Sequence, residues 1–314
     1  MRRWLYCGVA IAFSLFSGCP SPVDKLPLNE WKKMRSPTSK NLYGVAVGAI
    51  YEGWAVGDSG VILHRLHEAF YFRCVPSSVA TKLNAISFVQ GFIWIVGDSG
   101  VIMGGDYSTL PLSCPVLEKL NDVKQHIGGN IFWVCGDKGT VLHYNGKEWQ
   151  KLDPGVDFDL TDMCCLDSTD IWIVGKGGVL HFDGTQWSLD TLELGDSPSI
   201  YFTSPQDGWI ATPMGSDGWV YHYDGQRWEK VAVLKNTTPR DIAMHSPEEG
   251  FIVGTDIFQW DGSSWEKVKS GVNLYAIAVD TLNYGGVLNH RGALYYAVGA
   301  NGVIYGYEER EEEK

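Results

Sequence analysis

The stretch Trp54-Ala55-Val56-Gly57 returns along the chain at nearly regular intervals, and this repetition decides the fold. Related versions are WIVG at Trp94, WVCG at Trp133, WIVG at Trp172, WIAT at Trp209, FIVG at Phe251 and YAVG at Tyr296. The steps between them are 40, 39, 39, 37, 42 and 45 residues. A period of about 40–45 residues is typical of the four-stranded blade of a β-propeller. Seven copies therefore predict seven blades.

Each unit reads as four short strands. A stretch such as 240–244 (RDIAM) predicts the inner strand, and the W-x-V-G segment predicts the second. A glycine turn such as 58–60 (DSG) follows, and then a third strand that reads like VLHY. Next comes an Asn-Gly or Asp-Gly pair, which favours positive φ and predicts a tight hairpin. Four residues after each Asn or Asp, the outer strand carries a tryptophan: Trp149, Trp187, Trp228 or Trp265.

The last unit stops after its third strand, at 303–307, and the missing fourth strand is found at the other terminus. Residues 29–34 (NEWKKM) resemble the outer strand at 147–152 (KEWQKL). Pairing of the two ends closes the ring and leaves no frayed blade. We therefore predict an all-β fold with one domain rather than two. This domain is a seven-bladed β-propeller of four-stranded antiparallel blades over residues 29–307, closed by an N-terminal strand and followed by an acidic tail at 308–314.

Residues 1–18 are typical of a secretory signal, because two arginines precede an apolar run that is too short to span a bilayer. Residues 16–19 (FSGC) resemble the end of a bacterial lipoprotein signal, in which small residues lead into a lipidated cysteine. The resemblance implies a lipid anchor on Cys19, a tether over 19–28, and export to the periplasmic side of a bacterial membrane or to the cell surface. The alternative is an ordinary cleaved signal that leaves Cys19 as a free thiol.

The charge balance excludes one class of partner. Lys plus Arg number 25 against 37 for Asp plus Glu, which gives a formal net charge of -12. Such a chain repels phosphate backbones unless its basic residues cluster strongly, so we expect no nucleic-acid partner. The expected oligomeric state is a monomer.

Several patterns resemble catalytic or metal-binding motifs, but their positions in the repeat indicate structural roles. Residues 57–60 (GDSG) resemble the nucleophile turn of trypsin-like proteases, but Lys138 and Asn301 occupy the serine position in later units, so we interpret the turn as structural. The third-strand histidines lie in different blades and cannot converge on one ion: His64, His143, His181 and His222. The chain has no Walker-type loop, H-E-x-x-H helix or C-x-x-C pair, so we predict no catalytic residue, cofactor or metal. A disulfide between Cys74 and Cys114 is left as an alternative at this point.

The repeat also supports a family resemblance. The patterns W-x-V-G-D-x-G and L-H-Y-D-G, with the following Trp, resemble the propellers of photosystem II assembly factors and the wider bacterial family that shares their repeat. The Asp-Gly-x-x-Trp hairpins resemble the Asp-box (BNR) turns of sialidase-type propellers. A second analogy is the propeller lipoprotein of the outer-membrane barrel-assembly machinery. The assembly-factor resemblance implies protein binding without catalysis.

We therefore predict a non-enzymatic, lipid-anchored scaffold of the cell envelope that binds protein partners. The alternative is a glycan-binding or glycan-hydrolysing propeller, which predicts exposed aromatic side chains and at least two carboxylates gathered at the channel mouth.

Two sets of residues are candidates for a binding site. The first is an acidic ring on one face of the propeller, where the simpler interpretation is a set of solvated turn residues: Asp58, Asp98, Asp137, Asp157 and Asp159. The second set lies in two loops that break the repeat, in the fifth and seventh units: Ser216, Asp217, Tyr284, His290 and Arg291. Loops on a rigid scaffold often carry function.

Overall fold

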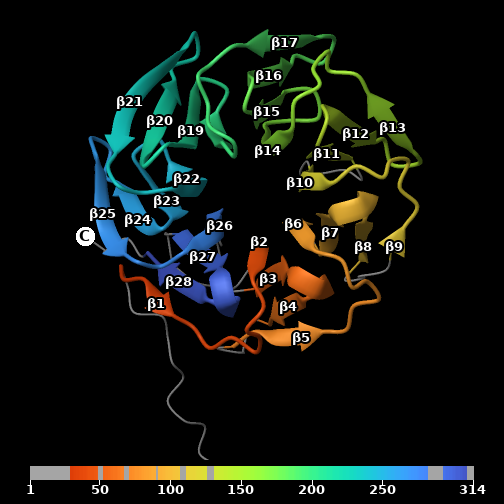
Figure 1. The fold of residues 1–314 in the computed structure, drawn as a ribbon, viewed down its shortest axis with the longest axis horizontal. Coiled ribbons are helices and arrows are strands. Elements are labelled where there is room, and N and C mark those ends of the chain that lie inside the picture. Colours follow the sequence, from red (N-terminus) through yellow and green to blue (C-terminus); the bar gives the residue numbers. More distant parts are fainter. Residues whose placement is uncertain are drawn as a thin grey trace, which may run out of the picture.

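The computed structural model describes residues 29–48, 52–66, 71–89, 91–106, 111–125, 131–281 and 293–309. This part of the chain forms seven four-stranded antiparallel sheets arranged around a central axis (Figure 1), which confirms the predicted propeller. The helical segments in these ranges are three single 3-10 turns. None of the described helical segments has the length and hydropathy needed to cross a membrane.

The strands follow the chain blade by blade. Blade 1 contains β2 (Leu42–Gly48), β3 (Glu52–Gly57), β4 (Ile62–Arg65) and β5 (Arg73–Val75). Blade 2 contains β6 (Leu83–Val89), β7 (Phe92–Gly97), β8 (Ile102–Asp106) and β9 (Pro111–Leu112). Blade 3 contains β10 (Leu120–Gln125), β11 (Phe132–Gly136), β12 (Thr140–Tyr144) and β13 (Trp149–Leu152). Blade 4 contains β14 (Leu160–Cys165), β15 (Ile171–Gly175), β16 (Gly178–Phe182) and β17 (Trp187–Asp190).

The remaining blades follow the same order. Blade 5 contains β18 (Ser199–Ser204), β19 (Asp207–Met214), β20 (Asp217–Tyr223) and β21 (Trp228–Leu234). Blade 6 contains β22 (Pro239–Ser246), β23 (Glu249–Gly254), β24 (Asp256–Trp260) and β25 (Trp265–Ser270). Blade 7 contains β26 (Leu274–Thr281), β27 (Ala293–Gly299), β28 (Ile304–Glu308) and β1 (Lys32–Lys33). The 3-10 turns are η1 (Asp58–Gly60), η2 (Asp98–Gly100) and η3 (Ala300–Gly302).

The ring closes as the sequence predicts. The N-terminal strand β1 pairs antiparallel with β28, with Lys32 opposite Gly306 (Figure 1). The neighbouring Trp31 is buried and meets the ring of Phe251 in blade 6 edge to face, with centroids 5.1 Å apart. Strand β28 extends to the buried Glu308, one residue into the stretch predicted as a tail. Blade 7 is therefore built from both ends of the described chain.

The meander within each blade defines two faces of the propeller. We call one the loop face, because it carries the connections between blades and the turns between second and third strands, such as η1. The other, the hairpin face, carries the remaining two turns of each blade, such as the one between β16 and β17. Residues in the turns of the loop face are therefore separated from those of the hairpin face by the full length of a strand.

The core lies between the blades, in seven hydrophobic clusters formed by neighbouring sheets of the described chain. The W-x-V-G segment supplies both sides of its blade, because side chains alternate along a strand. Trp54 and Val56 pack towards blade 2, whereas Ala55 between them packs towards blade 7. This alternation explains why the repeat keeps a large residue at its first position.

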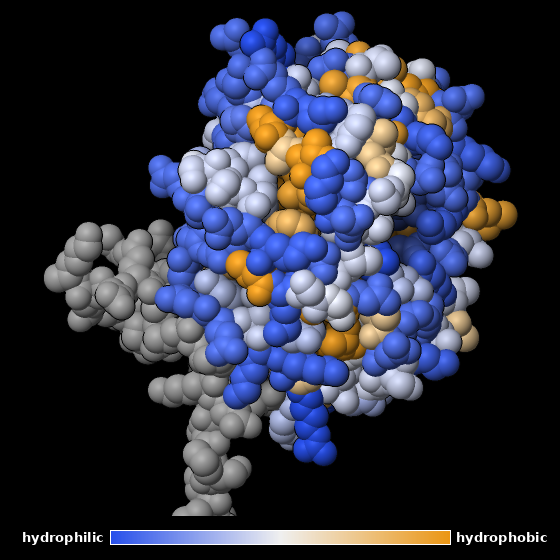
Figure 2. All heavy atoms as spheres, turned by 60° about the vertical axis from the view of Figure 1, so that its left-hand side comes forward, coloured by the Kyte–Doolittle hydropathy of each residue, from blue (hydrophilic) through white to orange (hydrophobic). Residues whose placement is uncertain are grey.

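The outer strands leave one edge of each sheet exposed. In Figure 2 apolar side chains lie scattered among hydrophilic ones on the side formed by blades 5 and 6. Val231 and Val233 of β21 and Val268 of β25 are all exposed; Glu229 and Lys230 precede the valines of β21, and lysines flank Val268 on both sides. Charged residues on an edge strand oppose pairing with a second sheet.

The D-x-G turn has a structural cause. Its middle residue has positive φ, as in Lys138 with φ 57, and so has the glycine that follows, Gly139 with φ 63. A Cβ on Gly139 would lie 2.0 Å from the carbonyl oxygen of Val156, in the connection to the next blade. A Cβ on Gly60, Gly100 or Gly302 would likewise come too close to a backbone carbonyl oxygen of a neighbouring connection. The turn therefore needs glycine for space, and its middle position tolerates serine, lysine or asparagine.

Candidate functional site

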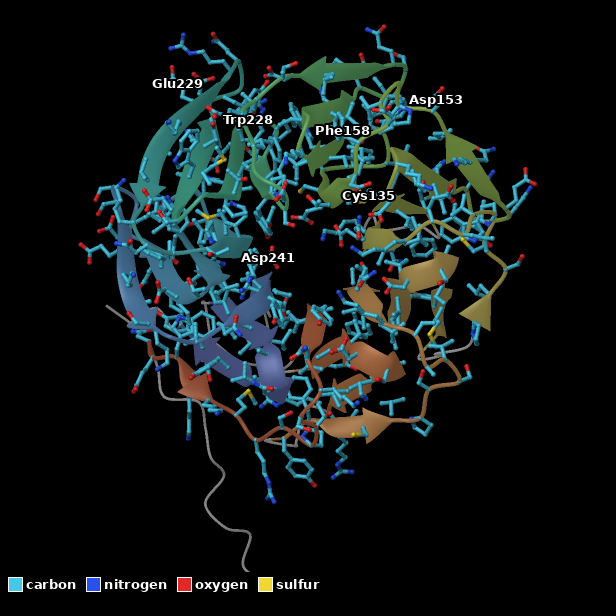
Figure 3. The ribbon with its side chains drawn as sticks, in the orientation of Figure 1. Cys135, Asp153, Phe158, Trp228, Glu229 and Asp241 are labelled. Atoms are coloured by element: carbon cyan, nitrogen blue, oxygen red, sulfur yellow. The ribbon has the colours of Figure 1, made fainter. Side chains whose placement is uncertain are left out.

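The first strands of the blades surround a central channel with a volume of about 970 Å³ (Figures 1 and 3). Both its walls and its mouth on the loop face come from these strands and the connections that precede them. Because the repeat places equivalent residues around the axis, each position of the first strand contributes a ring of side chains to the channel.

The second residue of several first strands clamps two blades together. Its side chain donates a hydrogen bond to the carbonyl oxygen at the start of the next blade. These bonds run from Asn84 to Leu120 (2.8 Å), Asn121 to Leu160 (2.8 Å), Thr161 to Pro198 (2.7 Å) and Arg240 to Leu274 (2.8 Å). Polar side chains at this position are thus part of the framework of the ring.

In blades 3 to 6, Asp122 and its equivalents make a contact of the opposite direction, in which the side chain accepts from the backbone of the next blade. The first strand is the inner edge of its sheet, so alternate N–H groups have no partner within the sheet. Side-chain oxygens supply one. Asp122 accepts from the N–H of Met163 (3.1 Å), Asp162 from Ile200 (2.8 Å), Ser199 from Ile242 (3.3 Å) and Asp241 from Ile277 (2.8 Å). The acidic residues of the channel therefore satisfy backbone donors that burial would otherwise penalise.

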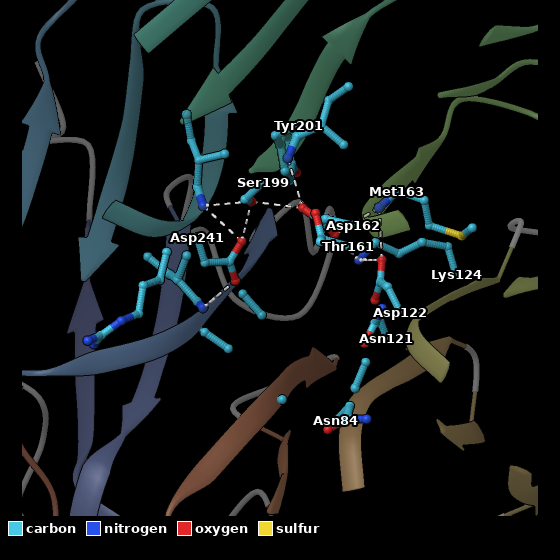
Figure 4. A pocket seen from close by; sticks show the side chains of 18 of the residues that line it. Asn84, Asn121, Asp122, Lys124, Thr161, Asp162, Met163, Ser199, Tyr201 and Asp241 are labelled. Atoms are coloured by element: carbon cyan, nitrogen blue, oxygen red, sulfur yellow. Dashed lines mark hydrogen bonds and ion pairs between the residues drawn. The ribbon is translucent and has the colours of Figure 1, made fainter. Parts of the chain in front are cut away.

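These side chains join into one chain along the channel wall (Figure 4). Lys124 Nζ lies 2.7 Å from Asp122 and 3.6 Å from Asp162. Ser199 Oγ lies 2.8 Å from Asp162 Oδ2 and 2.7 Å from Asp241 Oδ1. The network spans blades 3 to 6. In blades 7, 1 and 2 the same position holds Ala276, Gly44 and Ala85. The channel thus has one ionisable side and one with small side chains.

The network favours protonated carboxyl groups. Burial raises the pKa of Asp122 to about 8, with Lys124 opposing the shift and the charge of Asp162 adding to it. Burial also raises the pKa of Asp241 to about 7, again with a contribution from Asp162. Burial acts to lower the pKa of Lys124, but Asp122 and Asp162 outweigh it and hold that pKa well above its ordinary value.

A row of cations and aromatic rings lies at the mouth of the channel. Lys82 Nζ is 3.6 Å from the centre of the Tyr43 ring, and Tyr43 stacks on Tyr275 with centroids 5.0 Å apart. The guanidinium of Arg240 lies 4.7 Å from the centre of Tyr275. Each cation–ring contact contributes on the order of 1 kcal/mol. We call these four residues the mouth row.

In the described part of the chain, the cations of the mouth row are not held in salt bridges, although the charges of Asp98 and Asp58 act on Lys82. Within the described ranges, neither Lys82 nor Arg240 forms an ion pair. Burial lowers the pKa of Lys82 and the neighbouring Lys119 lowers it further, whereas the charges of Asp98 and Asp58 partly oppose this shift. Burial also lowers the pKa of Arg240. An anionic group entering the mouth would meet partly desolvated cations that form no salt bridge within the described ranges, which favours such a ligand.

Three acidic residues predicted as a binding ring already have partners within their own blade. Asp58 accepts from the hydroxyl of Tyr43 (3.5 Å), Asp98 from Asn84 (3.0 Å) and Asp137 from Asn121 (2.9 Å). These contacts orient the side chains that clamp neighbouring blades or form the mouth row. The three carboxylates therefore support the framework at the mouth.

The other predicted residues are distributed over the loop face. Asp157 and Asp159 are exposed, and Asp159 accepts from the N–H of Lys138. Ser216 is exposed, and Asp217 accepts from Lys235 Nζ at 2.7 Å. Four further predictions fall outside the described residues: Cys19, Tyr284, His290 and Arg291.

The channel carboxylates and the mouth row were missed by sequence reasoning. A signal was present, since Asp122, Asp162 and Asp241 follow a Leu or Pro by two residues at equivalent points of the repeat. The mouth row gave no such signal, because its residues come from two different positions of the repeat.

The outer-strand tryptophans bear on the glycan alternative. Each meets the W-x-V-G tryptophan of the preceding blade edge to face, and the centroids of Trp94 and Trp149 lie 6.2 Å apart. Equivalent pairs are Trp133–Trp187, Trp172–Trp228 and Trp209–Trp265. Carboxylates do gather in the channel, but backbone N–H groups, Lys124 and Ser199 engage them. Tryptophans packed between blades remove the main support for a sugar-binding surface.

The third-strand histidines occupy equivalent framework positions. His64 stacks on Trp54 and lies 2.8 Å from Glu52, which begins the second strand. His181 and His222 pair in the same way with Asp170 and Asp207. In blade 3 no acid stands at this position, and burial lowers the pKa of His143. His64, His181 and His222 are thus held by an acid of their own blade, whereas His143 stacks on Trp133.

The cysteines Cys74, Cys114, Cys135, Cys164 and Cys165 are free thiols in this structure, so the open bridge between Cys74 and Cys114 does not form in it. Burial raises the pKa of Cys164 to about 11 and that of Cys135 well above its usual value, which makes both thiols unreactive. In the ranges that the structure covers, no group of three or more acidic, histidine or cysteine side chains is arranged to hold a metal ion.

Comparison with known proteins places the fold in context. No family model matches the chain. The immune protein Tsi7 of Pseudomonas aeruginosa is 24% identical over 145 residues, which are 45% of this chain and 46% of Tsi7. The chain thus matches about half the length of this curated relative.

Solved structures resemble the propeller over nearly its whole length. YCF48 bound to a D1 peptide is 17% identical with a TM-score of 0.66, covering 90% of this chain and 99% of that one. YCF48 from Cyanidioschyzon merolae is 15% identical with a TM-score of 0.67, over 88% and 98%. The WD40 repeats of RRP9 are 9% identical with a TM-score of 0.74, over 91% and 99%. The chain is a seven-bladed β-propeller that shares its fold with YCF48 and with WD40-repeat propellers.

Proposed function

We propose that the chain is a non-enzymatic, protein-binding scaffold of the cell envelope, anchored by a lipid on Cys19. The observation that carries the binding role is the mouth row, in which Lys82 and Arg240 flank two stacked tyrosines and form no salt bridge within the described ranges. Binding hot spots are enriched in tyrosine and arginine, and both are preassembled here on rigid first strands.

The similarities support this proposal at the level of the fold. One structural neighbour, YCF48, has been solved with a D1 peptide bound, and a curated relative is described as an immune protein. Framework roles for the histidines, the D-x-G turns and the channel carboxylates are consistent with a scaffold that has no catalytic centre. A glycan-active propeller lacks comparable support, because the outer-strand tryptophans pack between the blades and the channel carboxylates are engaged by backbone N–H groups, Lys124 and Ser199.

The binding role is tested by comparing two charge reversals. Lys82→Glu changes the mouth row, whereas Lys147→Glu changes an exposed lysine in a turn of the hairpin face. Envelope proteins cross-linked to each variant in the native membrane are identified and quantified. We expect at least one protein to be retained by the wild type and Lys147→Glu and to fall at least tenfold with Lys82→Glu. Equal recovery with both variants would remove the mouth row from the proposal.

The anchor is tested separately. We expect metabolic labelling with a fatty-acid analogue to mark the wild type and not Cys19→Ser, and the variant to leave the membrane fraction. Labelling that persists in the variant, or a wild type without label, would contradict anchoring and leave the binding experiment unaffected.

A further inference from the structure

The hydroxyl of Ser199 carries fewer hydrogens than its two carboxyl contacts require. The Ser199 hydroxyl lies 2.8 Å from Asp162 Oδ2 and 2.7 Å from Asp241 Oδ1, which are hydrogen-bond distances (Figure 4). A serine has one hydroxyl hydrogen and can donate it to one of these oxygens. The other contact needs a hydrogen supplied by the carboxyl group itself.

The backbone cannot supply this hydrogen. The N–H of Ile200 points at Asp162 Oδ2, and that of Ile242 lies 2.8 Å from Asp241 Oδ1. These two N–H groups donate to other lone pairs of the carboxyl oxygens. They therefore do not provide the hydrogen that lies between a carboxyl oxygen and the Ser199 oxygen. Two ionised carboxylates on either side of one hydroxyl would also repel each other in a setting of low polarity.

We propose that Asp162, Ser199 and Asp241 hold one shared proton in the resting protein, and that this proton joins blades 4, 5 and 6 at the channel wall. When the proton leaves, two like charges face each other across Ser199 and the joint weakens. Arg240, adjacent to Asp241 on β22, belongs to the mouth row. The joint therefore links the pH of the surroundings to the shape of the channel mouth.

The surrounding groups favour retention of the proton. The charged side chains that act on Asp241 are Asp162 of β14 and Lys124 of β10. The other titratable residues with which these strands, β18 and β26 line the channel are Asp122, Cys164, Cys165, Tyr201 and Tyr275. Lys124 lies nearer to Asp122 than to Asp162. Burial and the charge of Asp162 raise the pKa of Asp241 to about 7. The release of the proton thus falls near neutral pH.

Infrared spectroscopy of the intact protein tests the proposal, because a protonated carboxyl group has its own C=O stretching band. We expect this band at pH 6 and its loss with a midpoint near pH 7. Asp241→Asn and Asp162→Asn should each abolish that midpoint, since the amide supplies the missing hydrogen. Asp157→Asn, in an exposed loop, should leave it unchanged. A second midpoint near pH 8, from Asp122 and Glu249, should persist in Asp241→Asn and Asp157→Asn, whereas Asp162→Asn should lower the Asp122 contribution because the charge of Asp162 helps to raise that pKa.

The wild-type spectrum decides the outcome even if a variant does not fold. A protein without a protonated carboxyl band that titrates between pH 6 and 8 would overturn the proposal, because the serine hydrogen would then be shared between two carboxylates. A midpoint near 7 that survives in both Asp241→Asn and Asp162→Asn would also overturn it by placing the proton elsewhere.

Discussion

Trp172 and Trp228 meet edge to face across the boundary between blades 4 and 5, with ring centroids 6.2 Å apart and planes inclined at 74°. One belongs to the W-x-V-G segment, and the other begins the outer strand of the next blade. The repeat thus encodes a contact between neighbouring blades as well as the fold of each blade. This pairing explains why the two tryptophans recur together in the sequence.

Trp228 offers a direct test of this contact, since its side chain is 8% exposed. We expect Trp228→Ala to lower the free energy of unfolding by about 3–5 kcal/mol, because it leaves a cavity between two blades. Trp228→Phe keeps an aromatic ring at the boundary and should lower it by about 1–2 kcal/mol. Urea denaturation measures both. Equal losses for the two variants would show that the ring contact contributes little.

Substitutions at two glycines with similar φ can distinguish the cost of backbone strain from the cost of a steric clash. Gly139 and Gly155 have φ of 63 and 77, but a Cβ on Gly155 would meet nothing within 4 Å. We expect Gly155→Ala to destabilise the protein by about 1 kcal/mol through φ alone. Gly139→Ala should add a further 1–3 kcal/mol from the contact with Val156. Thermal unfolding compares the two, and similar losses would contradict the role of the turn in spacing the blades.

Stability should fall as the pH rises from about 4 to about 8. The pKa values of Asp122 and Asp241 are raised in the folded protein to about 8 and about 7, above the value of 3.8 for an ordinary aspartate. The folded state keeps protons that the unfolded chain has released, so their contribution is complete below pH 4 and is lost as the pH passes through the folded values. Each held proton gives a slope of up to about 1.4 kcal/mol per pH unit.

Urea denaturation at half-unit steps from pH 4.5 to 9 measures this trend. Exposed aspartates of the hairpin turns act in the other direction. Hydrogen bonds from Thr185 and from two backbone N–H groups lower the pKa of Asp183 to about 2, so its contribution is lost only in strong acid. A free energy of unfolding that rises steadily up to pH 8 would contradict the raised values in the channel.

A second acidic pair lies between blades 6 and 7. Burial and a hydrogen bond with Glu309 raise the pKa of Glu249 to about 8. We expect Glu249→Gln to raise the melting temperature by a few degrees at pH 9, where the wild type carries two facing charges, and to have little effect at pH 5. Glu248→Gln, at the neighbouring exposed residue, is the control and should change neither value. A stabilisation that is equal at both pH values would argue against a shared proton.

The fold was predictable because its signal is periodic. Seven copies of W-x-V-G, with glycine turns at fixed offsets, leave few alternatives, and the resemblance of 29–34 to 147–152 located the closing strand. The site was harder to predict because it depends on contacts between blades. Asp122 and Asp241 lie 119 positions apart in the numbering, yet Asp162 and Ser199 connect them. The mouth row combines Tyr43 and Tyr275 from opposite ends of the chain.

The closing strand also sets a direction for mechanical load. The N–H of Asn29 donates to the carbonyl of Glu308, so the described chain enters blade 7 at the hairpin face and runs along β28 towards the loop face. A tether attached before Asn29 would pull along the axis of β1 and load its hydrogen bonds in shear, while Trp31 transmits part of the force to Phe251 in blade 6. Under the proposed anchor on Cys19, the chain would enter the propeller at its hairpin face, opposite the channel mouth.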